Sequence, residues 1–206
     1  MARKTKADKE KTYQALIESA AVLFHSQGYK ATTLNEIAEK AGMTRGAFYG
    51  HFSGKTEVLK AIWNEQAIPE FRQIKEALED LPPPNPAIEF RRQIDNLCEL
   101  FSENSKVGRA LFILMHNIEM SEREVELIEF LIGQHKMYES VFLKSFTRLH
   151  EAGQLKDGME PKIAAMGFLC ILFGMINKAL LPFLEFDFNR DGQPVFAHYL
   201  DSVLND

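Results

Sequence analysis

An all-α fold is predicted for this chain of 206 residues. In almost every long segment the apolar side chains recur at spacings of three and four, which is the period of a helix and not the alternation of a half-buried strand. Threonine, serine, glycine and proline stand where these helices are expected to begin and end. With 46% hydrophobic and 26% charged residues, the composition is that of a folded chain with a sizeable core.

The first two helices are predicted from an apolar stripe and a cap. Apolar residues between Leu16 and Phe24 line one face of the first helix, which Gly28 ends as a C′ glycine. The second helix begins after Thr33, because the Thr33 hydroxyl and the Glu36 carboxylate three residues later form a capping box. It closes at Ala41-Gly42.

Two more short helices follow. Thr44 can cap the third, in which Phe48 and Phe52 stand four residues apart and would point inward together. Ser53 can cap the fourth. This helix meets Pro69, where it should kink or restart because proline has no amide proton and clashes with the preceding turn.

The clearest boundary in the chain is Pro82-Pro83-Pro84-Asn85-Pro86, through which no helix can continue. Beyond it the periodicity predicts further helices near residues 87–103, 106–118, 122–151, 161–183 and 194–204. Such helices suit a bundle.

Charge is unevenly distributed along the chain. The formal net charge is −5, which argues against a uniformly basic protein that coats nucleic acid. Residues 1–66 nevertheless carry +3, and the remainder carries −8. The N-terminal third is therefore the part expected to meet a polyanion.

The sequence also predicts a compartment. No apolar stretch follows the basic start Met1–Lys6, so we expect no secretory signal and a cytoplasmic protein. The most apolar run, Ile163–Ile176, is shorter than the roughly 20 residues of a membrane-spanning helix, so we expect a buried helix and no membrane partner. Cys98 and Cys170 lie in apolar periodic segments and are expected to be reduced and packed as small hydrophobic residues.

The strongest functional signal is a helix-turn-helix pattern over residues 32–52. Ala38 supplies a small side chain where two helices cross, Gly42 is free to take positive φ at the turn, and Thr44 caps the helix that follows. The small core holding these helices would be Ile37, Ala41, Phe48 and Phe52. An ordinary helical hairpin is the alternative, because the same spacing occurs in many α-proteins.

In a helix-turn-helix the start of the second helix meets base edges in the major groove. Arg45 has the forked donors that suit guanine, whereas Gly46 and Ala47 allow close approach and, for Ala47, a contact with a thymine methyl. The other expected contacts are with phosphates, from Tyr49, His51 and Lys55, from Thr33 and Thr44 at helix N-termini, and from an arm with Arg3, Lys4 and Lys6.

The same residues resemble a known family. The stretch from Thr12 to Trp63 is similar to the DNA-binding domain of TetR-family transcriptional regulators, and most of all to AcrR-type repressors of multidrug efflux pumps. The motifs that carry the resemblance are Ala31-Thr32-Thr33-Leu34-Asn35-Glu36-Ile37-Ala38, Ala41-Gly42-Met43-Thr44-Arg45-Gly46-Ala47-Phe48-Tyr49 and His51-Phe52-Ser53-Gly54-Lys55. Gly50 departs from the pattern, because many members have an aromatic residue there.

The resemblance implies a homodimer that binds a near-palindromic operator and is released when a small hydrophobic effector enters its C-terminal domain. It places the DNA contacts on Thr33, Thr44, Arg45, Gly46, Ala47, Tyr49, His51 and Lys55. We therefore expect a helix-turn-helix domain over residues 1–54, with its basic arm, and a helical domain for ligand binding and dimerisation over residues 55–206. Control of efflux or detoxification genes is expected from the resemblance alone.

The ligand site must be predicted from composition, because the rest of the chain has no motif. Sixteen phenylalanines and eight methionines favour adaptable apolar volume between helices. The candidates are Trp63, Ile94, Leu97, Phe101, Leu111, Met115, Tyr138, Phe142, Leu169, Leu172, Phe173 and Ile176, with polar selectivity from His116, Asn117 or Glu119. Plain core packing is the alternative for each apolar candidate.

The last two long helices are the expected dimer surface, since one short recognition helix reads only a few base pairs and two half-sites are needed. They carry more apolar residues than a single bundle needs, namely Phe168, Leu180, Leu181, Phe183, Phe196, Tyr199, Leu200 and Val203. An intramolecular core is the competing interpretation.

Enzyme chemistry is not predicted. The sequence contains no GxGxxG after a strand, no phosphate-binding GxxxxGK[ST], no HExxH and no GxSxG, and its histidines show no paired metal spacing. We therefore expect no catalytic activity, cofactor or metal. Two other functions stay open at this point, a DNA-binding activator or regulator without an effector, and a helical enzyme or carrier.

Overall fold

The computed structural model describes residues 5–101, 106–116, 125–179, 181 and 183–205. It divides into two compact units, one of residues 1–68 with 109–130 and the other of residues 69–108 with 131–206. The regular elements formed by the described residues are helices, and an isolated bridge joins Leu155 to Leu204. The predicted all-α class is confirmed.

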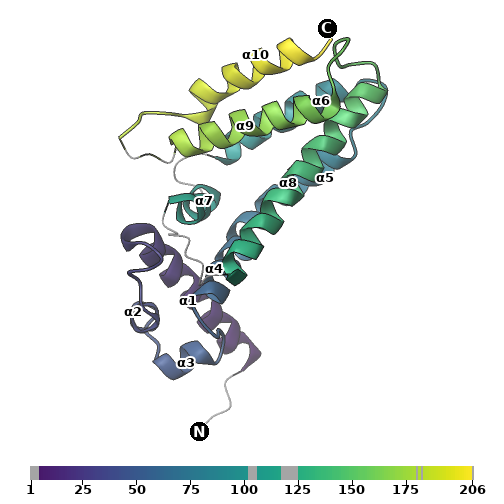
Figure 1. Ribbon diagram of the computed structural model, residues 1–206. Coiled ribbons are helices and arrows are strands. Elements are labelled where there is room, and N and C mark those ends of the chain that lie inside the picture. The colour runs from purple at the N-terminus through teal and green to yellow at the C-terminus, as the bar shows by residue number, and fades with distance from the viewer. Residues whose placement is uncertain (1–4, 102–105, 117–124, 180, 182, 206) are drawn as a thin grey trace. The chain divides into compact units, whose positions relative to one another are not determined.

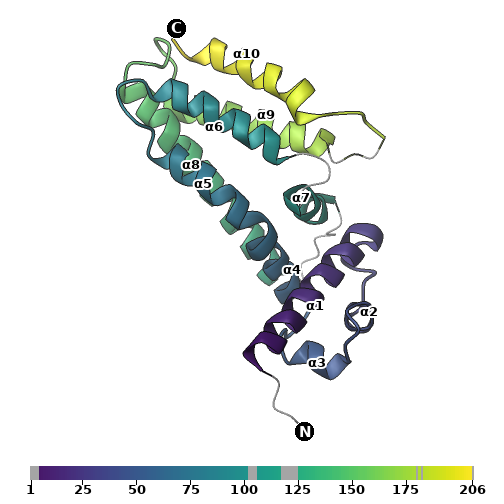
Figure 2. The same ribbon diagram turned by 180° about the vertical axis from the view of Figure 1, so that it is seen from behind.

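The first unit is built on a long helix at the N-terminus. Helix α1 (Lys6–Gln27) packs against α2 (Leu34–Lys40) and α4 (Lys55–Ile62), and α2 packs against α3 (Arg45–Tyr49) (Figures 1 and 2). This unit also contains most of α7 (Lys106–His116) and the first residues of α8 (Val125–Glu151). The three-helix arrangement with a helix-turn-helix that the sequence predicts is therefore present.

In the first unit the predicted caps are confirmed with one exception, whereas in the second unit the helix predicted over residues 161–183 ends earlier, at Ala179. Gly28 ends α1 with φ +89°, and Thr33 and Thr44 cap α2 and α3. The prediction that Ser53 caps the fourth helix is wrong, because Gly54 holds the N-cap position and makes no side-chain cap. Ser53 instead donates from its backbone nitrogen and hydroxyl to Glu57, at 2.6 and 2.8 Å, so it braces the helix from one residue further out.

The predicted restart near Pro69 is confirmed, and a wider helical turn comes before it. The π-helical turn η1 (Trp63–Ala67) follows α4 directly and leads into α5 (Ile68–Glu79). At its end the Ile68 N–H donates to the carbonyl of Trp63, five residues back. A proline ring clashes with the carbonyl four residues before it, and a π turn relieves that clash by widening the backbone. The boundary between the two units falls at Pro69.

The second unit contains α5 after its first residue, α6 (Pro86–Leu100), the rest of α8, α9 (Pro161–Ala179), the π turn η2 (Phe188–Gly192) and α10 (Gln193–Val203). Helices α5 and α8 lie side by side, as both ribbon views show, and the Ser145 hydroxyl joins them by donating to the Leu78 carbonyl at 2.8 Å. Helix α10 packs on α6 and α9. The predicted break at Pro82–Pro86 lies between α5 and α6.

Phenylalanines form the core of this unit. The ring of Phe168 on α9 lies among aromatic rings from α6, α8 and α10. The distance between ring centroids is 4.7 Å to Phe142, 4.8 Å to Phe196 and 5.9 Å to Phe90. Phe146 completes the cluster. All five rings are buried.

This packing corrects the predicted dimer surface. Phe168, Phe196, Leu200 and Val203 are buried within the chain, so the intramolecular interpretation holds for them. Tyr199 is half-buried and donates to the Ala164 carbonyl at 2.6 Å, and Leu181 is half-buried. Phe183 alone among the predicted residues is largely exposed, and Leu180 lies outside the described residues.

The two cysteines differ from each other. Cys98 is buried on α6, where burial raises the pKa of its thiol to about 12, as expected for a packed hydrophobic residue. The prediction for Cys170 is wrong, because it is exposed on α9. The α9 sequence is apolar on nearly every face, so its periodicity does not reveal which stripe packs inward.

Candidate nucleic-acid interface and ligand site

A small buried core holds α2 and α3 in a fixed crossing. Of the predicted core residues, Ile37, Phe48 and Phe52 are buried, with the Phe48 and Phe52 rings 5.7 Å apart. Ala41 is only half-buried, and Ala38 is buried in its stead. Gly42 has φ +69°, the left-handed conformation that only glycine takes without strain, and the Met43 N–H donates to the Ala38 carbonyl at 2.8 Å. The chain thus turns tightly between two short helices and presents the second one outward.

Both threonine caps are formed. The Thr33 hydroxyl accepts from the Glu36 N–H at 3.2 Å, and the Glu36 carboxylate accepts from the Thr33 N–H and hydroxyl at 2.7 Å each. These bonds, first of all that from the backbone N–H, hold the pKa of Glu36 below its usual 4.5. The Thr44 hydroxyl accepts from the Ala47 N–H at 3.2 Å. Thr33 and Thr44 are thus exposed at the N-termini of two capped helices, and their contacts with phosphates stay a prediction.

The outer face of α3 carries Arg45, Gly46, Ala47 and Tyr49. Arg45 Nη2 donates to the Tyr49 hydroxyl at 3.2 Å, and its guanidinium carbon lies 5.5 Å from the centre of the Tyr49 ring. Tyr49 is 49% exposed, and a Cβ added to Gly46 would meet its nearest atom at 3.9 Å. This face of α3 is exposed and carries the positive charge of Arg45. The contacts of its guanidinium with Tyr49 orient it along the helix.

His51 and Lys55 differ from this open face. His51 is half-buried, with its ring 6.1 Å from that of Tyr13. The Lys55 ammonium donates to the carbonyls of Tyr29, Thr32 and Lys30 at 2.7, 2.9 and 3.1 Å. Lys55 therefore ties down the connection between α1 and α2, and its phosphate contact stays a prediction. In the predicted arm, Lys6 is exposed at the start of α1, whereas Arg3 and Lys4 lie outside the described residues.

A charged cluster in the first unit was not predicted. The Arg109 guanidinium of α7 binds both carboxylate oxygens of Glu18 on α1, at 2.9 and 3.0 Å. Gln66 of the π turn donates to the same carboxylate at 3.2 Å. These three residues are far apart in the chain and belong to no motif, so only the folded structure brings them together.

The predicted ligand residues are distributed over both units. Trp63 is buried in the π turn of the first unit, where Leu111 is buried and Met115 is 36% exposed on α7. Asn117, Glu119 and the His116 side chain lie outside what the structure describes. In the second unit, Ile94, Leu97, Phe101, Phe142, Leu169, Leu172 and Ile176 are buried, and Phe173 and Tyr138 are half-buried.

These residues do not form one site in the second unit. Phe142 belongs to the packed phenylalanine core. Phe101 and Tyr138 both contact Phe71, at 5.8 and 5.9 Å between ring centroids. The Tyr138 hydroxyl is buried and has no hydrogen-bond partner among the described residues.

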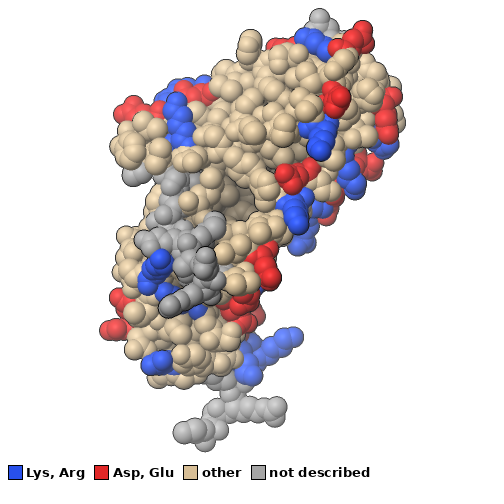
Figure 3. All heavy atoms as spheres, viewed as in Figure 1, with Lys and Arg blue, Asp and Glu red and all other residues tan. Residues whose placement is uncertain are grey.

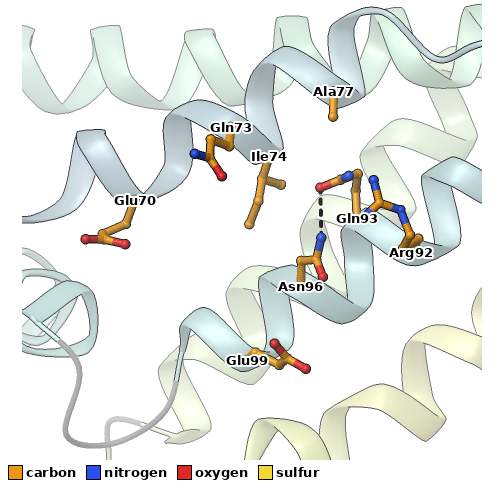
Figure 4. A pocket seen from close by; sticks show the side chains of 8 residues that line it. All are labelled: Glu70, Gln73, Ile74, Ala77, Arg92, Gln93, Asn96 and Glu99. Atoms are coloured by element: carbon orange, nitrogen blue, oxygen red, sulfur yellow. Dashed lines mark hydrogen bonds between the residues drawn. The ribbon is translucent and has the colours of Figure 1, made fainter.

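Two of the clefts in the second unit are lined mainly by residues that were not predicted. An apolar groove of about 580 Å³ runs between α8 and α9, and Leu169 and Phe173 line it together with Leu143, Met166 and Cys170. A cleft of about 370 Å³ lies between α5 and α6, and Figure 4 shows Gln73 and Ile74 facing Gln93 and Asn96 across it. The sequence predicted neither cleft, because each depends on how two helices pack. Within the described residues, no three His, Cys, Asp or Glu side chains are placed to hold a metal ion.

Comparisons with known proteins agree with this geometry. The family model described as bacterial regulatory proteins, tetR family, matches residues 16–62. The HTH-type transcriptional regulator SrpR of Pseudomonas putida is 55% identical over 62 residues, which is 30% of this chain and 29% of SrpR. For the curated relatives that match first, the chain spans between 29% and 55% of their length.

Solved structures match almost the whole chain. The secondary repressor NalD of the MexAB-OprM multidrug efflux pump in Pseudomonas aeruginosa has a TM-score of 0.85 and 28% identity, over 98% of this chain and 100% of NalD. A complex of SmeT with triclosan has a TM-score of 0.84 and 26% identity, over 95% of this chain and 92% of SmeT.

Proposed function

We propose that this chain, which belongs to the tetR family of bacterial regulatory proteins, is a cytoplasmic transcriptional repressor that binds a near-palindromic operator as a homodimer. A small hydrophobic effector releases it from DNA, and the genes that it controls serve efflux or detoxification. The observation that carries the proposal is the exposed face of α3, held outward by two formed threonine caps and a positive-φ glycine. The relatives are regulators, and we propose no catalytic activity.

Arg45 reads the operator in this proposal. Its bond to Tyr49 points the guanidinium along the exposed face, so less side-chain freedom is lost when it donates to guanine O6 and N7. Gly46 and Ala47 let the helix approach the groove closely. Thr33, Thr44, Tyr49, His51 and Lys55 contact phosphates and set the register without reading sequence.

A second copy of the chain covers α9 and α10. Ile163 and Met166 on α9 are 50% and 54% exposed, Val195 on α10 is 44% exposed, and Cys170 extends the same α9 stripe. In Figure 3 the face of the second unit near α9 and α10 consists mainly of uncharged residues. Burying such a surface against its own copy gives two recognition helices for half-sites about 34–36 Å apart.

Effector binding in residues 55–206 acts through α4, which bears Val58, and the π turn after it, which bears Trp63. The π turn before Pro69 is the hinge in this proposal, because a widened turn has weaker geometry than an α-helix and is often a point of bending. The complex of SmeT with triclosan supports an aromatic, mostly apolar effector. To empty the operator, the effector must prefer the displaced state by a few kcal/mol.

Selection of bound fragments from genomic DNA with the purified protein, followed by footprinting, tests this function. The expected result is a site with two related halves, protected by a dimer, next to a promoter. Retention of all DNA sequences alike, or protection of a single half-site by a monomer, contradicts the proposal. A sequence-specific site whose occupancy no aromatic compound changes supports a regulator without an effector instead.

A further inference from the structure

The hydroxyl of Tyr138 is in an unusual situation for a buried polar group. Tyr138 lies on α8 in the second unit, and its ring meets that of Phe71 on α5 edge-on, at 5.9 Å and 69°. The hydroxyl oxygen is buried, although part of the side chain remains accessible. Among the residues that the structure describes, nothing accepts its proton or donates to its oxygen.

Such a group carries a cost that most proteins avoid. The large majority of buried side-chain polar atoms have a hydrogen-bond partner, because losing water without replacement is unfavourable. Tyr199 illustrates the ordinary case, since its hydroxyl donates to the Ala164 carbonyl at 2.6 Å. Burial also raises the pKa of Tyr138, so the phenol stays protonated and is a donor at any physiological pH.

The surroundings of this donor are aromatic. Phe71 contacts Phe101 at 5.8 Å, and Phe101 contacts Phe188 at 4.9 Å. A row of rings from α5, the C-cap of α6 and η2 thus leads away from Tyr138. Phe71, Phe101 and Phe188 are buried. Aromatic edges and faces of this kind favour a flat, apolar partner, and a single donor among them fixes how that partner is oriented.

We infer that Tyr138 is a specificity-determining residue whose hydroxyl donates a hydrogen bond to an acceptor atom of the effector. The effector is then an aromatic molecule with a carbonyl or ether oxygen beside its rings, and a pure hydrocarbon of the same shape binds less well. This inference rests on the proposed function, in which a small hydrophobic molecule binds residues 55–206.

Two probes of equal size test this assignment with the full-length protein. 2-Acetylnaphthalene and 2-ethylnaphthalene differ only in the carbonyl oxygen, and calorimetric titration gives the affinity of each for the wild type and for Tyr138→Phe. We expect the ratio of the two affinities, ketone over hydrocarbon, to fall by roughly three- to tenfold in the variant, which is the range for one net hydrogen bond. An unchanged ratio overturns the inference.

Thermal unfolding without any probe supplies a second, independent readout. If the hydroxyl has no partner, Tyr138→Phe unfolds at the same temperature as the wild type or at a higher one. A clearly lower temperature shows that the hydroxyl is already bonded in the free protein and overturns the inference.

Tyr199→Phe is the matched control, because it also removes one phenol oxygen. It breaks the bond to Ala164 and should lower the unfolding temperature, while the ketone-to-hydrocarbon ratio stays at the wild-type value. If the wild type binds neither probe, the inference is overturned, whereas the effector part of the proposed function is judged separately, by whether any aromatic compound changes operator occupancy. A bound ketone with an unchanged ratio overturns the role of Tyr138 alone.

Discussion

The helix-turn-helix and the phenylalanine core of the second unit are held together over very different distances along the chain. In the helix-turn-helix, the bonds that fix the shape join near neighbours, such as Thr33 with Glu36 and Thr44 with Ala47. In the second unit, Phe168 meets Phe90 and Phe196, which come from helices far away in the sequence. The conformation of the first region is determined largely by neighbouring residues, whereas the contacts of the second region form only when distant helices pack together.

This difference matches the two tasks proposed for the protein, DNA recognition and effector binding. Local bonds give the turn one preferred shape, which is what a surface that must fit a fixed DNA groove needs. A core assembled from distant rings has many near-equivalent ways to pack, which suits a region that must adapt to a ligand. Variants in each region should therefore fail in different ways.

The largest expected effect is on the long-range core. Phe168→Ala removes a ring that contacts Phe90, Phe142, Phe146 and Phe196, and should lower the free energy of unfolding by about 3–5 kcal/mol. Denaturant titration measures this loss. Ile88→Ala is the control, because Ile88 is 67% exposed on α6 and should cost no more than about 0.5 kcal/mol. Similar losses for both variants would mean that the rings do not pack as described.

The next effect is on DNA recognition and leaves folding unchanged. Arg45→Ala should weaken operator binding by about 1–3 kcal/mol and relax selectivity at one base position, because a forked donor to guanine is lost. Competition binding against operators changed one base at a time measures this. Lys40→Ala removes another cation, from the last turn of α2, and should not change the base preference. An equal loss of affinity for Arg45→Ala on every sequence contradicts the assignment of Arg45 to a base.

A smaller effect, on the order of 1 kcal/mol, is expected for Lys55→Met. Whether it appears in the free energy of unfolding or in DNA affinity shows which role Lys55 has. The bonds of the ammonium to three carbonyls predict a loss of stability, since the connection between α1 and α2 loses its anchor. A phosphate contact predicts instead an unchanged free energy of unfolding and a slope of affinity against salt that falls by about one. Denaturant titration and binding at several salt concentrations separate these outcomes.

Much of the first region follows from the sequence for a physical reason. Thr33, Gly42 and Thr44 each act on their own turn, so their residue type indicates their conformation without knowledge of the rest of the fold. Ser53 shows the limit, because a glycine next to it takes the cap position and the serine bonds one turn further on.

The second region follows from the sequence only as a set of helices. Phe168 and Cys170 are two residues apart on an apolar helix, yet one is in the core and the other is exposed. The choice is made by which helices pack against α9, and no local pattern records it. The unpaired hydroxyl of Tyr138 and the pairing of Glu18 with Arg109 were missed for the same reason.

The smallest expected effect concerns pH and tests how local the first region is. The pKa of Glu36 is lowered in the folded protein, so its carboxylate stabilises the fold above its unfolded pKa, near 4.5, and this contribution is lost as the pH falls through the folded value. Glu36→Gln should therefore be less stable than the wild type at pH 7, and the two should converge as the pH falls below 4.5. The main bonds of Glu36 are those to Thr33 in its own turn, with a weaker one from Gln27 of α1, and Glu39→Gln is the matched control, because Glu39 is an exposed neighbour on α2 whose removal leaves these bonds intact. A wild-type advantage that persists undiminished at acid pH would mean that the ionised form of Glu36 is not what stabilises the cap, and that the helix start depends on contacts outside its own sequence.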